Sequence, residues 1–231
     1  MQVEFLGRMK LEVCCADLAS LRAAVEGGAH RVELCQALGL DGLTPSAGMI
    51  EMAVESGITV HVLIRPREGN FVYSQDEVEC MVRDIRMARS LGAHGVVIGA
   101  LTEKGDIDLA TCRRLMDEAQ GMHITFHRAF DVCRDPLTAF EQILSLGCDR
   151  LLTSGHERTA EEGIPLISQL VEIAKSTRRD EDFNVMPGAG VSVENAARIL
   201  KETGAKEIHG SLRKDGHTDV GMVRSVVATI S

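Results

Sequence analysis

The chain alternates between short apolar segments and helical segments along nearly its whole length, and this alternation constrains the fold more than any other feature. The apolar segments are brief and rich in Val, Ile or Leu, as buried parallel strands are. Eight such strands are predicted, at residues 10–14, 31–35, 58–64, 94–99, 123–127, 149–153, 183–187 and 206–210. Eight strand–helix units predict a parallel sheet that closes into a (βα)8 TIM-type barrel.

Helix boundary signals lie between the predicted strands. Side chains that can accept a hydrogen bond from a helix N-terminal amide open five of the segments, two of them directly before proline. These are Asp17, Thr44, Ser74, Asp135 and Ser192. Glycine, which readily adopts the left-handed conformation that ends a helix, follows several segments. The ends are predicted at Gly27 or Gly28 and at Gly57, Gly92, Gly147 and Gly204.

An open doubly wound sheet is the alternative fold for the same alternation. That fold often carries a Gly-rich dinucleotide fingerprint after its first strand, whereas this chain reads CCADLAS there. A length of 231 residues suits one barrel, and no linker or low-complexity segment divides it. We therefore expect an N-terminal extension at residues 1–9 and a single barrel domain at residues 10–231.

Charge and composition limit the classes of partner that the protein is expected to bind. The chain has 25 basic against 34 acidic residues, a net charge of −9, and only 3% aromatic residues. An acidic surface repels nucleic acid and anionic membranes, so neither is expected as a partner. No apolar stretch resembles a signal peptide or a membrane span, and seven unevenly spaced cysteines suit a reducing compartment. We expect a cytoplasmic protein; a homodimer is compatible with the sequence, which does not fix the assembly.

A carboxylate and a thiol occur together on each of the first two predicted strands. The pattern is Glu12-Val13-Cys14 on one strand and Glu33-Leu34-Cys35 on the next. Because side chains alternate between the two faces of a strand, Glu12 shares a face with Cys14 and Glu33 with Cys35. The intervening residues are apolar and suit packing under helices. The Glu-x-Cys face is therefore predicted to point into the barrel, with the thiols at the C-terminal rim.

These thiols suggest a site for a soft metal ion. Strands one and two are expected neighbours, which brings Cys14 near Cys35, and Cys15 lies at the end of the first strand. Thiolates select Cu(I) or Zn(II) over Mg(II). The alternative interpretation for any single cysteine is a small buried hydrophobe.

Charged and imidazole side chains mark the ends of the third and fifth strands. On strand three, Arg65 falls at the rim, while strand five ends with His127, Arg128 and Asp131. A histidine there is a candidate general acid or base, and a nearby aspartate could fix its tautomer. The arginines could hold an anion.

Small residues end the last three strands. TSG at 153–155, PGAGVS at 187–192 and HGS at 209–211 expose backbone amides beside helix N-termini. Loops of this kind often hold phosphate in barrels, so Ser154, Gly188 and Gly190 are predicted to bind an anion. The alternative is that glycine simply permits tight turns.

Taken together and in order, the motifs of this chain resemble those of the CutC family of copper homeostasis proteins. Between residues 10 and 212 they read LEVCCADL, RVELC, DGLTPS, HVLIRPREGNFVYS, TFHRAFD, RLLTSG, GAGV and EIHGS. The resemblance implies a TIM barrel, a cytoplasmic location and Cu(I) handling. It also implies that Cys14, Cys15 and Cys35, which match the family's proposed copper-binding cysteines, are the metal ligands. The stretch QALGL at 36–40 matches no firm pattern.

Two functions remain open at this stage. The first is Cu(I) binding through thiolates at the barrel mouth. The second is an enzyme that acts on a small phosphorylated or carboxylated metabolite, because Cu(I) does not prefer carboxylates. In that case the catalytic residues would be Glu12, Glu33, His127 and Asp131. Glu12 or Glu33 would serve as base or metal ligand, and His127 as acid/base. The expected ligand is accordingly a copper ion or a small anion.

Overall fold

The computed structural model describes residues 9–177 and 183–231, so that residues 1–8 of the expected extension lie outside the described part. The predicted barrel is confirmed. Eight parallel strands form one sheet in the order β7-β6-β5-β4-β3-β2-β1-β8, and β7 and β8 lie side by side, which nearly closes it. The strands are β1 Lys10–Cys15, β2 Arg31–Leu34, β3 Thr59–Leu63, β4 Gly95–Ile98, β5 His123–Phe126, β6 Arg150–Thr153, β7 Asn184–Pro187 and β8 Glu207–Gly210.

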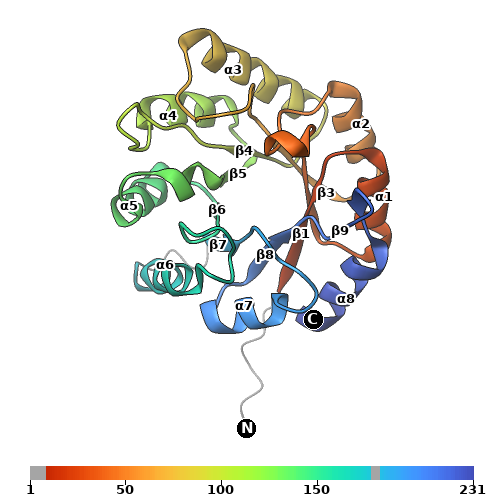
Figure 1. The fold of residues 1–231 in the computed structure, drawn as a ribbon. Coiled ribbons are helices and arrows are strands. Elements are labelled where there is room, and N and C mark those ends of the chain that lie inside the picture. Colours follow the sequence, from red (N-terminus) through yellow and green to blue (C-terminus); the bar gives the residue numbers. More distant parts are fainter. Residues whose placement is uncertain (1–8, 178–182) are drawn as a thin grey trace.

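Helices surround the strands in a ring (Figure 1). They are α1 Leu18–Gly27, α2 Ala47–Glu55, α3 Gln75–Ser90, α4 Leu109–Glu118, α5 Pro136–Leu146, α6 Ile164–Ser176, α7 Ala196–Thr203 and α8 Val220–Ile230. Two short 3-10 helices, η1 Leu38–Leu40 and η2 Arg128–Val132, follow β2 and β5, and a small hairpin of β9 Arg213–Lys214 and β10 His217–Thr218 follows β8. Within the described residues, no helix is long and apolar enough to cross a membrane.

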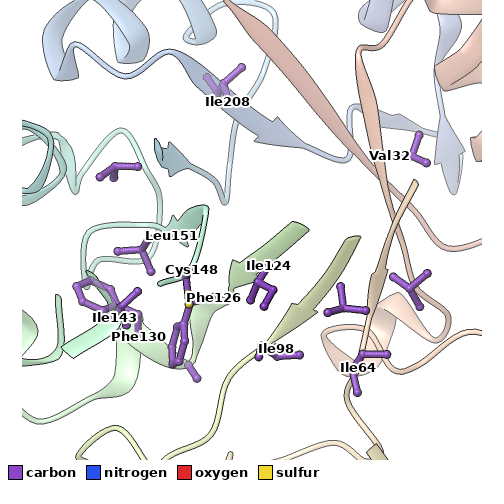
Figure 2. Close-up of a cluster of buried hydrophobic side chains, with 14 of the residues drawn as sticks. Val32, Ile64, Ile98, Ile124, Phe126, Phe130, Ile143, Cys148, Leu151 and Ile208 are labelled. Atoms are coloured by element: carbon purple, nitrogen blue, oxygen red, sulfur yellow. The ribbon is translucent and has the colours of Figure 1, made fainter. Parts of the chain in front are cut away.

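The buried apolar side chains form two layers. The larger layer lies between the outer face of the strands and the helices, and it includes Val32, Ile124 and Phe126 (Figure 2). The smaller layer fills the barrel interior near its mouth and consists of Cys14, Cys35, Leu63 and Val97. The alternation read from the first two strands is therefore confirmed, because their apolar residues face the helices and their Glu-x-Cys residues face inward.

Three of the five predicted N-terminal caps are confirmed, at Asp17, Ser74 and Asp135. The other two helices begin later than predicted. Helix α2 starts after Ser46 because the Thr44 hydroxyl is already engaged, accepting from the Arg65 amide at 2.9 Å. Helix α7 starts after Asn195, whose side-chain oxygen accepts from the Ser192 amide at 2.8 Å and forms a turn before the helix.

Buried ion pairs occupy the barrel floor, at the N-terminal ends of the strands. The Arg31 guanidinium donates to Glu12 and to Glu207, the latter at 2.5 Å, and Arg150 donates to Glu207 at 2.9 Å. All four side chains are less than a tenth exposed. Burial by itself raises the pKa of Glu207, but the charges of Arg31 and Arg150 outweigh it and lower that pKa below its ordinary value. No pattern in the sequence had pointed to Arg31, Arg150 or Glu207 as a network.

This arrangement predicts a large cost for Glu207→Ala. The change leaves Arg31 without one of its two carboxylates and Arg150 without its partner, both inside the barrel, and breaking a buried pair costs about 3–5 kcal/mol. We expect the free energy of unfolding, measured by urea denaturation, to fall by about this amount. The control is Glu51→Ala on the exposed face of α2, where a change of about 0.5 kcal/mol or less is expected. Equal effects of the two substitutions would contradict a structural role for the floor network.

Candidate functional site

A cavity of about 830 Å³ opens at the C-terminal ends of the strands. Its lining includes most of the residues that were predicted to form a site. These are Cys14, Glu33, Cys35, Arg65, His127, Arg128, Asp131 and Gly190. Glu12, Cys15, Ser154 and Gly188 are not among the lining residues. The barrel therefore gathers side chains from β1, β2 and the loops after β3, β5 and β7 into one mouth, as the position of active sites in this fold leads one to expect.

The two inward-facing cysteines lie against each other at the bottom of the cavity. Their Sγ atoms are 3.7 Å apart, and both thiols are free and buried. The register of β1 against β2 places Cys14 opposite Glu33, one layer below Cys35. The hydrogen bond with Cys35 and burial both raise the pKa of Cys14 well above its ordinary value. Cys14 is therefore a neutral thiol in this state, and a cation must displace its proton in order to bind the thiolate.

A glutamate and a histidine stand beside this thiol pair. Ligand atoms of Cys14, Glu33 and His209 all lie within 4.8 Å of one another. The Nε2 atom of His209 is 3.7 Å from a Glu33 carboxylate oxygen. Burial raises the pKa of Glu33 above its ordinary value. Burial also lowers the pKa of His209, but the Glu33 charge and the bond to Glu12 outweigh it and raise that pKa.

His209 was missed by the sequence analysis, which treated the end of the eighth strand as a run of small residues. The pattern Glu207-Ile208-His209 in fact repeats the alternation of the first two strands, with polar residues facing inward and an apolar residue facing the helices. The same period-two argument that selected Cys14 and Cys35 would have selected His209.

Glu12 is fully enclosed beneath the cavity and does not reach the ligand space. Its carboxylate lies 2.8 Å from Nδ1 of His209 and accepts from Arg31. Burial would raise the pKa of Glu12, but Arg31 and His209 hold it well below its ordinary value. Glu12 was predicted to act as a base or a metal ligand, and this geometry gives it no access to the ligand space for either role. The residue instead positions His209, leaving Nε2 of that ring directed toward Glu33.

Cys15 lies on the opposite face of β1 from Cys14. Its side chain is fully buried in the layer between strands and helices, and its Sγ atom contacts the backbone oxygen of Val13 at 3.6 Å. The structure thus brings together two of the three predicted cysteine ligands. The reason is the strand itself, which continues through Cys15 and so assigns consecutive residues to opposite faces.

Arg65 is enclosed in the cavity wall, only 3% exposed. Its Nη1 atom donates to the backbone oxygens of Leu40 at 2.8 Å and Gly42 at 3.0 Å, and its Nη2 atom donates to that of Gly69 at 3.0 Å. Its Nε atom is buried without a hydrogen-bond partner. The guanidinium therefore joins the loops after β2 and β3 and still retains donor capacity.

His127 is held by the backbone and not by Asp131, which corrects the prediction that Asp131 fixes its tautomer. Its Nδ1 atom accepts from the Ala129 amide at 3.1 Å, so the ring proton is carried by Nε2. Burial, with the charge of Arg65, lowers the pKa of His127 to about 3. Gly99 leaves room for the ring, because a Cβ there would stand 2.5 Å from its Cε1 atom. The ring is therefore a fixed neutral donor, not an acid or base that titrates near neutrality.

Asp131 organises the end of β6. Its carboxylate accepts from the Thr153 hydroxyl at 2.5 Å, from the Ser154 amide at 3.0 Å and from Arg128 at 2.8 Å. The Ser154 hydroxyl is also engaged, donating to the backbone oxygen of Glu157 at 2.6 Å. Both donors of Ser154 therefore already have internal partners, the amide with Asp131 and the hydroxyl with Glu157, so this arrangement leaves neither of them for the predicted anion.

The two predicted glycines of the β7 loop differ in position. Gly188 lies against Leu152 and His209, where an added Cβ would stand 2.5 Å from a Leu152 methyl group. Gly190 lines the cavity and has a φ of +69°, which suits glycine. Gly188 thus serves packing, and Gly190 alone borders the ligand space.

The fold and the site define a class: a TIM barrel whose mouth carries two adjacent thiols, an imidazole and a carboxylate. The CutC family model matches residues 9–214. A CutC protein of Bacteroides fragilis is 52% identical over 205 residues, which is 88% of this chain and 80% of that protein. One from Pasteurella multocida is 49% identical over 202 residues, which is 87% of this chain and 81% of that protein.

A solved structure gives the same assignment. It is a CutC protein from Streptococcus agalactiae whose description names copper homeostasis. The two chains are 37% identical with a TM-score of 0.81, and the match covers 88% of this chain and 98% of that one. The chain belongs to the CutC family.

The environment of His127 predicts an unusual titration. With a pKa of about 3, its ring remains in the neutral Nε2–H form from pH 8 to pH 5. Long-range ¹H–¹⁵N spectra of the folded protein should show one fixed tautomer for His127 across this range. In the urea-unfolded chain the same ring should titrate near the ordinary value of about 6.5. A His127 signal that moves with pH around 6 in the folded protein would contradict this assignment.

Proposed function

We propose that this CutC chain binds Cu(I) at the bottom of the barrel mouth through the thiolates of Cys14 and Cys35. The observation that carries the proposal is the 3.7 Å separation of their Sγ atoms, contributed by adjacent strands, with both thiols free. Two sulfur atoms this close can contact one soft ion, and thiolate ligands favour Cu(I) or Zn(II) over hard cations.

His209 is the third ligand best supported by the geometry. One of its ring nitrogens is engaged with Glu12, and its other nitrogen belongs to the cluster with Cys14 and Glu33. A metal-binding histidine commonly has its second nitrogen fixed by a carboxylate in this way. Cys15, the third cysteine expected from the family resemblance, would have to leave the helix-side core to join the ion.

The thiolate proposal predicts loss of copper binding in the Cys14→Ser, Cys35→Ser double variant. Competition with a chromophoric Cu(I) chelator, under anaerobic reducing conditions, measures the affinity. The control is Cys80→Ser, which removes an exposed thiol on α3 and should bind Cu(I) as tightly as the wild-type protein. The double variant should keep only the weak Cu(I) binding that its other thiols provide. Unchanged affinity in the double variant would contradict the proposal. Stronger retention of Zn(II) than of Cu(I) in a direct competition would shift the assignment to zinc.

The contact between Glu12 and His209 predicts a partial loss of metal affinity when Glu12 is changed. Glu12→Gln keeps the side-chain shape but weakens the interaction that orients His209. Loss of such an outer partner typically lowers metal affinity by about 10–100-fold. The same chelator competition should show this decrease with both thiols intact. An affinity equal to that of wild type would argue that His209 is not a ligand.

A second candidate function is favoured by the size of the mouth. A cavity of about 830 Å³ is far larger than one ion requires and falls in the usual range for sites of small organic molecules. Glu33 and His209, whose pKa values are both raised, form a pair able to exchange a proton. We propose acid/base catalysis on a small anionic metabolite as the alternative activity, with Glu33 as the base.

Exchange of substrate C–H protons with D2O, followed by ¹H NMR over a panel of small carboxylates and phosphate esters, tests this alternative. Exchange that requires the protein and is lost in Glu33→Gln would support it. Absence of exchange across the panel would count against it. The copper measurement is independent of this result.

A further inference from the structure

A buried arginine in the cavity wall lacks a balancing charge. Arg65 is 3% exposed, and its three hydrogen bonds go to backbone oxygens. Within residues 9–177 and 183–231, no carboxylate oxygen lies within 4.0 Å of its nitrogen atoms, since the ion pairs found there involve other residues. A buried cation is costly unless it is paired, and carbonyl groups supply only partial charge.

The acidic side chains around the mouth do not supply that charge. Asp41 and Glu103 are exposed on the rim, and Glu33 lies beside His209 and Cys14. Asp131 is engaged with Arg128, Thr153 and Ser154. The Tyr73 hydroxyl lies close enough to interact with the Arg65 guanidinium, but burial raises the pKa of that hydroxyl to about 12, so it stays neutral and supplies no negative charge. The Arg65 cation therefore faces the cavity uncompensated by the groups around it.

A second unsatisfied donor lies in the same wall. The Nε2 atom of His127 carries the ring proton and is buried without a hydrogen-bond partner. Both His127 and Arg65 pack against the ring of Phe71, at 4.9 Å between ring centroids and 5.1 Å from the guanidinium carbon to the centroid. Leaving a buried donor unpaired costs about 1–3 kcal/mol, which an acceptor atom on a ligand would recover.

We propose that the outer part of the cavity binds a small organic carboxylate through Arg65 and His127, with its carbon chain against Phe71. The Nε–H group of Arg65 and the Nε2–H group of His127 are both covered in this structure, so the side chains of the wall must shift before the two groups can donate to one carboxylate. Leu63, Leu101 and Val132 also line the cavity and offer apolar surface to the rest of the ligand.

A monoanion suits this wall better than a phosphate dianion. Among the described residues that line the cavity, only Arg65 carries a full positive charge without a carboxylate partner, and the carboxylates of Asp41, Glu103 and Glu33 also border the cavity. A second negative charge on the ligand would meet these groups without a further cation. A planar carboxylate also matches the plane of a guanidinium edge.

This ligand site goes beyond the proposed copper function and does not depend on it. The thiol pair lies at the bottom of the cavity on β1 and the end of β2, whereas the two donors come from the ends of β3 and β5. Ligand binding can therefore be measured in the Cys14→Ser, Cys35→Ser double variant. Retained carboxylate binding there, with copper binding lost, would separate the two sites.

The test uses isobutyrate as the probe, isobutyramide as its neutral counterpart and inorganic phosphate as the competing anion. Affinities are measured by isothermal titration calorimetry at constant ionic strength, because salt screens weak charge interactions. Isobutyrate should bind the wild-type protein and isobutyramide at least about tenfold more weakly, as expected for a hydrogen bond with a charged group. Equal binding of the acid and the amide, or no binding of isobutyrate, would overturn the proposal. Tighter binding of phosphate would overturn the carboxylate assignment.

Two variants at His127 locate the site while preserving the local turn. H127N keeps an acceptor for the Ala129 amide but does not reach the position of Nε2, so isobutyrate should bind about tenfold or more weakly. H127Q places an amide N–H nearer that position and should restore part of the affinity.

R65M should abolish binding, with the fold checked by circular dichroism, since it also removes three contacts to loops. Unchanged affinity in H127N would overturn the proposal even if R65M does not fold.

Discussion

The charge of Arg31 on the barrel floor is the interaction on which the site depends. Arg31 pairs with Glu12 and Glu207 and keeps both carboxylates ionised in a closed interior. Ionised Glu12 holds one nitrogen of His209, and His209 in turn faces Glu33 and Cys14. A continuous chain of contacts thus runs from the floor to the mouth. In the low-polarity interior each hydrogen bond or ion pair of this chain strengthens the next one. Any of these charged groups buried without its partner would destabilise the fold.

The mouth has two chemically distinct tiers. The lower tier carries the neutral Cys14 thiol beside the His209 imidazole and the Glu33 carboxyl group, a set that could hold a cation once the cation displaces the thiol proton. The upper tier carries two fixed donors, Arg65 and His127, whose positions are set by backbone atoms. The proposed binding of a soft ion would use the first tier and leave the second unexplained. This difference accounts for a copper family resemblance alongside groups that copper does not prefer.

Strand alternation and nearness in the sequence led to both the correct and the incorrect predictions of site residues. Strand alternation correctly placed Cys14 beside Cys35, and it would have placed Cys15 on the far face had the strand been extended by one residue. Asp131 was close to His127 in the sequence, yet it is bound to the end of β6. Ser154 was predicted to bind a ligand because the sequence does not show that its donors are already engaged. Such errors concern which partner a polar group finds, and that choice is made between segments far apart in the chain.

The sequence by itself determined the barrel, because eight apolar strands with capped helices between them can bury their faces in few other ways. It also determined the inward face of the first two strands through the period of two. Only the tertiary structure decided the partners of the polar groups. His209 and Glu12 are 197 positions apart and meet because β8 pairs with β1 in one particular register. Closure of the sheet, and not any local pattern, gives the thiol pair its histidine and carboxylate.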